Sequence, residues 1–210
     1  GRLPEGKMKS REGTVVDADD LIRSMYEEAK KTSEESGKLA DLPEEEKERL
    51  YHMIGLGALK YFIIKVDPKK TMLFNPKESI DFNGNTGPFI QYTHARIRSI
   101  LRKAAGKGLT ADASLVGKDQ VLSPKEIRLV KLMNQYPSKL KEAADALSPA
   151  VLANFSYDLA KEFNQYYHDT PILREEDRDT LCMRLVMIDT VASVLEKAMG
   201  ILGISLPDRM

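Results

Sequence analysis

The sequence has 210 residues, of which 42% are hydrophobic, and its 32 Lys and Arg balance its 32 Asp and Glu. This length and apolar content suffice for one or two domains with a buried core. A net charge of zero gives no general reason to expect a polyanionic partner, so nucleic-acid binding must rest on local charge. The single cysteine, Cys182, excludes an internal disulfide and fits a reducing cytoplasm. The sequence contains no run of about 18 apolar residues, so we predict no membrane-spanning helix.

Helical patterns with clear start signals dominate the first third of the chain. The first predicted helix covers about residues 18–35, with Asp17 as its N-cap. A second begins at Pro43, and the three glutamates that follow suit the positive end of a helix dipole. Gly55 and Gly57 lie inside this second helix, where small residues predict close packing by another helix.

A segment rich in turn-forming dipeptides interrupts the helices between residues 66 and 87, and we expect it to be irregular. Helical periodicity returns at Pro88 and runs to about Ala105. Gly106 and Gly108 then stop it. This helix is the one on which the candidate binding residues lie.

The remaining sequence predicts further helices and no parallel sheet. Ser123–Glu126 is a capping box with proline at the first helical position, and Pro137 breaks the helix that it starts. Ser148 and Pro149 open another helix. Apolar residues then step by four and three over 181–199, and Gly200 and Gly203 end that helix. We therefore predict an all-α helical bundle without a complete nucleotide-binding sheet.

Candidate catalytic and metal-binding residues are sparse. His52, His94 and His168 are scattered and lack partners at metal-ligand spacing, so we predict no metal site. Each is expected to be a surface residue or a hydrogen-bonded core residue. The sequence also contains no nucleophile elbow and no phosphate-cradling glycine motif. The residues alone therefore indicate no self-sufficient active site.

One segment is locally basic although the chain is neutral. Residues 82–111, a window of 30, contain no Asp or Glu, whereas acids make up 32 of the 210 residues overall. The window carries five cations: Arg96, Arg98, Arg102, Lys103 and Lys107. It coincides with the helix predicted from Pro88.

Two stripes run along this predicted helix. One is apolar and consists of Ile90, Ile97, Leu101 and Ala104. The other repeats at steps of three and four and consists of Phe89, Tyr92, Arg96, Ser99 and Lys103. Rings followed by cations suit unpaired RNA, because bases stack on rings and cations contact phosphates. On spacing alone, the alternative is that the rings belong to the core and the cations to a solvated face.

A second basic feature lies near the start of the chain. Lys7, Lys9 and Arg11 place three cations within five residues on a segment bounded by Gly6 and Gly13. We expect the whole stretch of residues 1–13 to be an exposed loop. Such a loop can hold a phosphate chain, and an ordinary basic loop is the alternative.

Three segments, in this order, resemble arginyl-tRNA synthetases. Residues 6–16 are similar to the Lys-Met-Ser-Lys-Ser signature loop as that family carries it. Residues 82–96 resemble the opening of the family's helical anticodon-binding domain, and residues 202–210 its carboxy terminus. The resemblance implies a DALR-like helical anticodon-binding domain over 83–210. Residues 1–82 would be the end of the catalytic core, a short stub with connecting helices.

The resemblance also implies a function. The family is a class I ligase that attaches arginine to its tRNA with ATP, so we expect tRNA(Arg) anticodon recognition here. ATP and Mg²⁺ are cofactors implied for the full-length enzyme, with none bound by this chain alone. By position, Lys7, Lys9 and Arg11 are the implied ATP contacts. Ser10 stands where the class usually has a second lysine, which puts the role of Lys9 in question.

The implied tRNA contacts coincide with the second stripe. The family meets the anticodon loop with residues at the positions of Phe89, Tyr92 and Arg96, and packs its terminal methionine, here Met210, nearby. With Lys103, these residues form the predicted tRNA site.

The family's His-Ile-Gly-His signature and nucleotide-binding sheet are not in this sequence, so we expect this chain alone to be inactive in arginine activation. The expected partners are tRNA(Arg), with arginine and ATP for the full-length enzyme. We expect a monomer in the cytoplasm and no membrane contact. A helical protein-interaction module or a general RNA-binding module is the alternative function.

Overall fold

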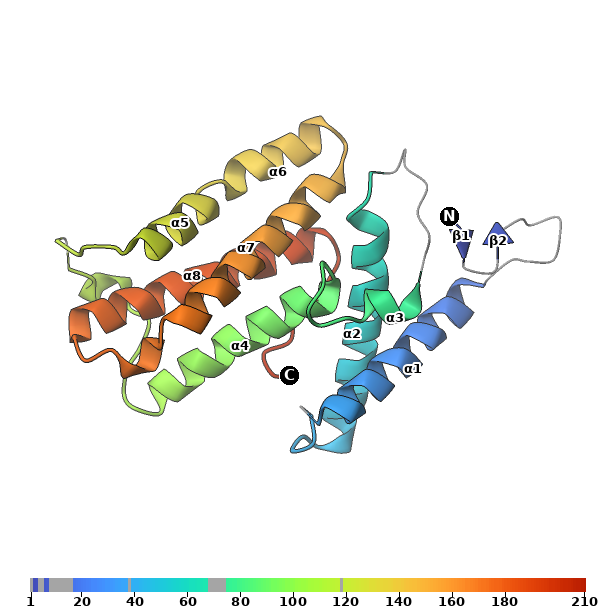
Figure 1. The fold of residues 1–210 in the computed structure, drawn as a ribbon, viewed down its shortest axis with the longest axis horizontal. Helices are drawn as coiled ribbons and strands as arrows, with labels where there is room; N and C mark the ends of the chain where they lie inside the picture. The colour runs from blue at the N-terminus through green and yellow to red at the C-terminus, as the bar shows by residue number, and fades with distance from the viewer. Residues whose placement is uncertain (1, 4–5, 8–16, 38, 68–74, 118) are drawn as a thin grey trace.

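The computed structural model describes residues 2–3, 6–7, 17–37, 39–67, 75–117 and 119–210. These residues form a helical bundle, which confirms the predicted all-α class (Figure 1). The helices are α1 (Ala18–Ser36), α2 (Glu44–Ile64), α3 (Pro76–Ser79), α4 (Gly87–Ala105), α5 (Pro124–Met133), α6 (Tyr136–Asp145), α7 (Pro149–Asp169) and α8 (Arg178–Ile201). Two short 3-10 helices are η1 (Ala113–Leu115) and η2 (Ile172–Arg174).

The predicted helix starts are confirmed by their caps. Asp17 accepts a hydrogen bond from the Asp19 N–H at 2.9 Å at the start of α1. Before α5, the Ser123 N–H donates to Glu126 Oε2 at 2.7 Å, and the Glu126 N–H donates to Ser123 Oγ at 3.3 Å. These reciprocal bonds satisfy backbone donors that the first turn of a helix leaves unpaired.

Three sequence predictions are corrected. The segment predicted to be irregular between residues 66 and 87 contains the short helix α3, which Asn75 caps by accepting from the Lys77 N–H at 3.2 Å. Gly200 was expected to end α8, but it lies inside the helix, and the left-handed residue is Gly203 at φ 70°. The expected loop at the start contains strands β1 (Arg2–Leu3) and β2 (Gly6–Lys7), which pair antiparallel. Elements this short are invisible to periodicity.

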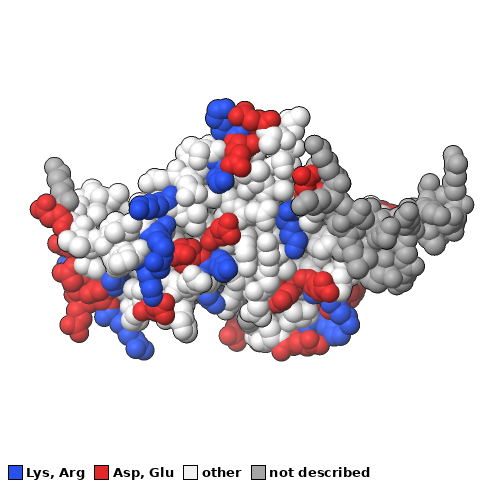
Figure 2. Space-filling model, turned by 45° about the horizontal axis from the view of Figure 1, so that its top comes forward, with Lys and Arg blue, Asp and Glu red and all other residues white. Residues whose placement is uncertain are grey.

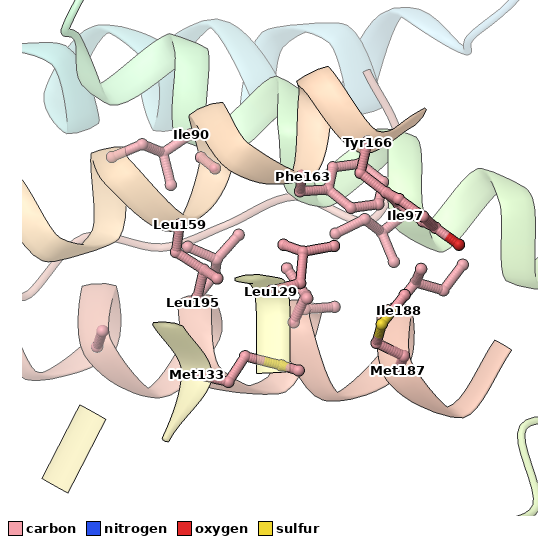
Figure 3. Packing of buried hydrophobic residues seen from close by; sticks show 14 of the residues in the cluster. Ile90, Ile97, Leu129, Met133, Leu159, Phe163, Tyr166, Met187, Ile188 and Leu195 are labelled. Atoms are coloured by element: carbon pink, nitrogen blue, oxygen red, sulfur yellow. The ribbon is translucent and has the colours of Figure 1, made fainter. Parts of the chain in front are cut away.

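The described part of the chain has two clusters of buried apolar side chains. The larger fills the space among α4, α5, α7 and α8, where Ile97, Leu159 and Ile188 are fully buried (Figure 3). The smaller lies between α1 and α2 around Met25 and Ile54. Burial of these side chains is the main stabilising contribution to such a bundle.

Small residues on α2 permit close packing, as predicted. A Cβ on Gly55 would lie 2.8 Å from the Met25 carbonyl oxygen of α1, so only a glycine allows this approach. A Cβ on Gly57 would lie 2.5 Å from Nε2 of Gln91 on α4. The two glycines therefore allow α1 to pack closely against α2 at Gly55 and α4 to pack closely against it at Gly57.

The residues after α8 return across the bundle. This carboxy-terminal tail, residues 202–210, passes beside α4 and ends toward α2 and α1 (Figure 1). Met210 packs against the smaller apolar cluster, next to Leu42. Among the helices that the structure describes, none combines the length and apolar character needed to span a bilayer.

Candidate nucleic-acid interface

The second stripe of α4 lies at the edge of the larger core. Thr86 caps this helix by accepting from the Phe89 N–H at 3.2 Å, which fixes where the stripe begins. Phe89, Tyr92 and Arg96 are half-buried and Lys103 is exposed. Each ring is therefore partly buried in the core and partly exposed at the surface. Both interpretations of their spacing, as core residues and as a surface for RNA, apply in part.

Arg96 is held in a defined orientation between α4 and α7. Its guanidinium carbon lies 4.7 Å from the ring centroid of Tyr92 and 5.4 Å from that of Tyr167. Its Nη1 donates a hydrogen bond to Asn164 Oδ1. Asn164 in turn donates to Thr93 Oγ1 at 2.7 Å. A planar cation fixed by two rings and an amide is preorganised for directional hydrogen bonds.

The tail closes one side of a hollow beside Arg96. This tail-side hollow has a volume of about 400 Å³, and its lining includes Tyr92, Arg96, Lys103, Tyr167 and Met210. The structure thus brings four of the five residues predicted for tRNA contact to one place. The ring of Phe82 packs edge-on against the ring of Tyr92, with the two ring centroids 6.3 Å apart.

A second hollow continues on the other side of Arg96. This η2 hollow has a volume of about 610 Å³ and shares Arg96, Lys103 and Tyr167 with the first. His168 and Arg174 line its far side. The two hollows therefore lie on either side of two shared cations and one ring, an arrangement that suits a chain of several linked groups.

Phe89 faces a different space. It lines a third hollow of about 590 Å³, where its ring centroid lies 5.4 Å from that of Tyr157. Cations line this Phe89 hollow too, but acids lie next to them. The Lys125 ammonium pairs with Asp169 and lowers the pKa of that carboxyl, and Arg128 pairs with Glu162 at 2.9 Å. Of the predicted tRNA residues, Phe89 is therefore the one that stands apart.

The basic segment is less basic in the folded protein than in the sequence. Arg98 forms ion pairs with Asp189, Glu196 and Asp208 at 2.9, 3.2 and 3.6 Å, so acids of α8 and the tail neutralise it. Lys103 makes no ion pair with any residue that the structure describes. Positive and negative side chains are interspersed over the face in Figure 2. Local placement, not net charge, therefore distinguishes the tail-side hollow.

The signature-loop residues cannot be placed in the same way. Lys7 lies on β2, while Lys9 and Arg11 fall outside the described residues. Within the described ranges, His, Cys, Asp and Glu form no group of three that could hold a metal. His52 and His168 are exposed, and His94 is a hydrogen-bonded core residue, as expected of scattered histidines.

Tyr167 and Asn164 of α7 contact Arg96 at the candidate site, and the sequence prediction did not include them. Tyr167 directly follows Tyr166, a buried residue of the larger core, and neither was predicted to bind RNA. A pattern of polar and aromatic residues next to the buried positions could have indicated them. Asn164, Tyr167 and His168 follow at steps of three and one, on a face that lines the η2 hollow.

Comparisons with known proteins identify relatives of the whole chain. Residues 90–210 match the family model of the DALR anticodon binding domain. The chain is 55% identical over 208 residues to an arginine–tRNA ligase of Phocaeicola vulgatus, which is 99% of this chain and 34% of the relative. It is 52% identical over 208 residues to that of Porphyromonas gingivalis W83, covering 35% of it. The chain thus spans about a third of the length of these relatives.

Solved structures agree. An arginyl-tRNA synthetase of Thermus thermophilus superimposes with a TM-score of 0.83 at 29% identity, covering 100% of this chain and 34% of that one. An arginyl-tRNA synthetase of Plasmodium falciparum superimposes with a TM-score of 0.78 at 22% identity, covering 93% of this chain and 34% of that one. At that identity the second match shows the shared fold alone. The resemblance stated from the sequence is confirmed.

Proposed function

Since the chain belongs to the family of DALR anticodon-binding domains, we propose that it binds the anticodon loop of an arginine tRNA in the tail-side hollow. The observation that carries the proposal is Arg96, held between the rings of Tyr92 and Tyr167. Unpaired bases stack on such rings, and RNA recognition of this kind targets loops whose bases can be splayed out.

The hollow offers both parts of a single-strand site. Tyr167 keeps 37% of its surface exposed, which leaves part of its ring available for stacking. Lys103 and Arg209 bring cations to the same hollow for the phosphates. Arg96 supplies N–H donors whose direction Asn164 fixes, which suits the edge of a base. Stacking gives affinity for any base, so discrimination between anticodons is assigned to Arg96.

The tRNA contacts proposed here are Phe89, Tyr92, Arg96, Lys103 and Met210. Phe89 differs from the others because it faces the Phe89 hollow. A strand that crosses Asn164, which lines both the η2 hollow and the Phe89 hollow, would reach it. Phe89 is thus proposed to contact a different nucleotide from the one held by Tyr92.

Arginine attachment is proposed for the whole protein of which such a domain is part. The chain spans 34% of the length of the Phocaeicola relative, so ATP, Mg²⁺ and arginine are assigned to the remainder together with Lys7, Lys9 and Arg11. The proposed division lies between residues 82 and 83. The smaller apolar cluster consists of residues before it, with Met210 packed against it, and the larger consists of residues after it, apart from Tyr61. The chain alone is proposed to be a monomer that does not activate arginine. ATP–pyrophosphate exchange by a pure sample would refute that.

The test is binding to an arginine-accepting anticodon stem-loop, beside a stem-loop with a changed anticodon. If a base stacks on Tyr92, Tyr92→Ala should weaken the binding free energy by about 1–3 kcal/mol, which raises the Kd roughly 5- to 150-fold. Arg96→Ala should in addition remove the preference for the arginine anticodon. Arg23→Ala is the matched control, because Arg23 is exposed on α1 and does not line the hollow. Equal binding of both stem-loops by the unaltered chain would refute the proposal.

A further inference from the structure

We propose that Lys60, Gln91 and His94 are positioning residues that fix the register of the carboxy-terminal tail and thereby place Met210 in the tail-side hollow. None of the three lines that hollow. The inference rests on the proposed function, because the hollow is the proposed binding site. Its geometry, however, is independent of any RNA.

Side chains of α2 and α4 hold the tail through its backbone carbonyls. The bonds join Lys60 Nζ to Gly203 O at 2.6 Å, Gln91 Nε2 to Ser205 O at 2.9 Å, His94 Nδ1 to Pro207 O at 2.9 Å and Arg102 Nη1 to Asp208 O at 2.9 Å. The first three acceptors alternate along the chain. Ser205 and Pro207 are two residues apart, and donors on α4 bind both of their carbonyls, so this part of the tail lies along α4.

Bonds to carbonyls set register and leave the tail's side chains available. A slip of two residues would place the same donors on the next set of carbonyls and move Met210 by about 7 Å. That displacement would take Met210 out of its place beside Tyr92 and Lys103. The donors therefore determine which side chain closes the hollow.

His94 is suited to hold one position. The Pro207 oxygen can only accept, so Nδ1 carries the proton and Nε2 is the unprotonated nitrogen. The side chain is 1% exposed, and Nε2 is without a hydrogen bond in the described part of the chain. Burial lowers the pKa of His94, which keeps the ring neutral beside Arg98, Glu196 and Asp208. A neutral ring in this tautomer donates one hydrogen bond, from Nδ1, in one fixed direction.

Gln91 connects the tail to the helix pair α2 and α4. Its Nε2 donates to Ser205 O and also to Met53 O of α2 at 3.1 Å, so both amide hydrogens are used. The side chain is fully buried and fits because Gly57 has no Cβ. Tail register and the contact between α2 and α4 thus depend on one amide.

One helix carries both functions on adjacent faces. Gln91, His94, Arg98 and Arg102 follow at steps of three, four and four and face the tail. The stripe that includes Tyr92, Arg96 and Lys103 faces the hollow. Because both sets lie on α4, the tail's end is delivered beside the residues proposed to bind RNA.

The experiment uses the chain as it stands, with methyl-labelled methionine. In the absence of RNA, His94→Leu should move the Met210 methyl resonance to the position of a solvent-exposed methionine, whereas His94→Asn, which keeps an N–H near Nδ1, should restore it. His52→Leu is the matched control, because His52 is exposed and is not one of the residues bonded to the tail carbonyls. If His94→Leu fails to fold by circular dichroism, Lys60→Met removes a tail bond from a residue that is not buried.

Binding gives the second readout as a double-mutant cycle. His94→Leu and Met210→Ala should each raise the Kd for the anticodon stem-loop by about tenfold, and the pair by no more than either alone. Additive losses, or a Met210 resonance that does not move, would overturn the inference. If the unaltered chain fails to bind the stem-loop, the proposed function fails, while the methyl resonance still decides whether these residues hold the tail.

Discussion

Replacing Arg96 with lysine separates charge from shape at the proposed site. Lysine keeps the positive charge but loses the plane that lies between two rings at 4.7 and 5.4 Å. Each cation–π contact of a partly exposed group contributes about 0.5–1 kcal/mol, so the two together contribute about 1–2 kcal/mol. The hydrogen bond to Asn164 also loses its fixed direction.

Two quantities should respond differently. The free energy of unfolding should decrease by about 1–2 kcal/mol in urea denaturation. The ratio of Kd values for changed and arginine anticodons should decrease by roughly 5- to 30-fold, whereas the slope of log Kd against log salt should stay the same because the charge remains. Fluorescence anisotropy with labelled stem-loops at two salt concentrations measures both. Arg23→Lys on α1 should change neither. Full anticodon preference in Arg96→Lys would show that Arg96 acts as a point charge and refute the directional role.

Three further outcomes are expected. Gly57→Ala should lower stability by about 1–3 kcal/mol, because its Cβ would lie 2.5 Å from Gln91 Nε2, whereas Gly200→Ala, with nothing within 4 Å, should be neutral or stabilising in thermal denaturation. Lys103→Ala should reduce the salt slope of stem-loop binding by about 0.7 and leave anticodon preference unchanged, if Lys103 contacts one phosphate. Since the folded-state pKa of His94 lies below its ordinary 6.5, the unfolded chain binds more protons, so stability should fall as pH decreases through that value. Urea midpoints at about pH 7.5 and 5.5 test this last point, and His94→Asn should flatten the difference.

Helix boundaries could be predicted from the sequence because their signals are local. The Asp17 cap and the capping box at Ser123 depend on residues within three positions, so chain order alone reveals them. The stripe of α4 was predictable for the same reason. Strands of two residues and a helix of four were not, because each covers only about one period of its pattern, and periodicity needs several repeats to be recognised.

The composition of the hollow required tertiary structure. Periodicity places Arg96 on the second stripe of its helix, but it does not indicate that α4 and α7 bring Arg96 and Tyr167 together. The neutralisation of Arg98 by three acids from α8 and the tail is likewise a long-range result. Met210 was predicted from resemblance alone, and the tail bonds now give it a physical place beside Tyr92.

The central claim is that the anticodon loop occupies the tail-side hollow, and site-directed photocrosslinking tests it most directly. A stem-loop carrying a photoreactive base in its anticodon would be irradiated with the chain, and the attached peptide identified by mass spectrometry. The account predicts attachment to α4 near Tyr92, to α7 near Tyr167 or to the tail at Met210, and its suppression by excess unlabelled stem-loop with the arginine anticodon. Attachment confined to α1 or α6, or unaffected by that competitor, would contradict it.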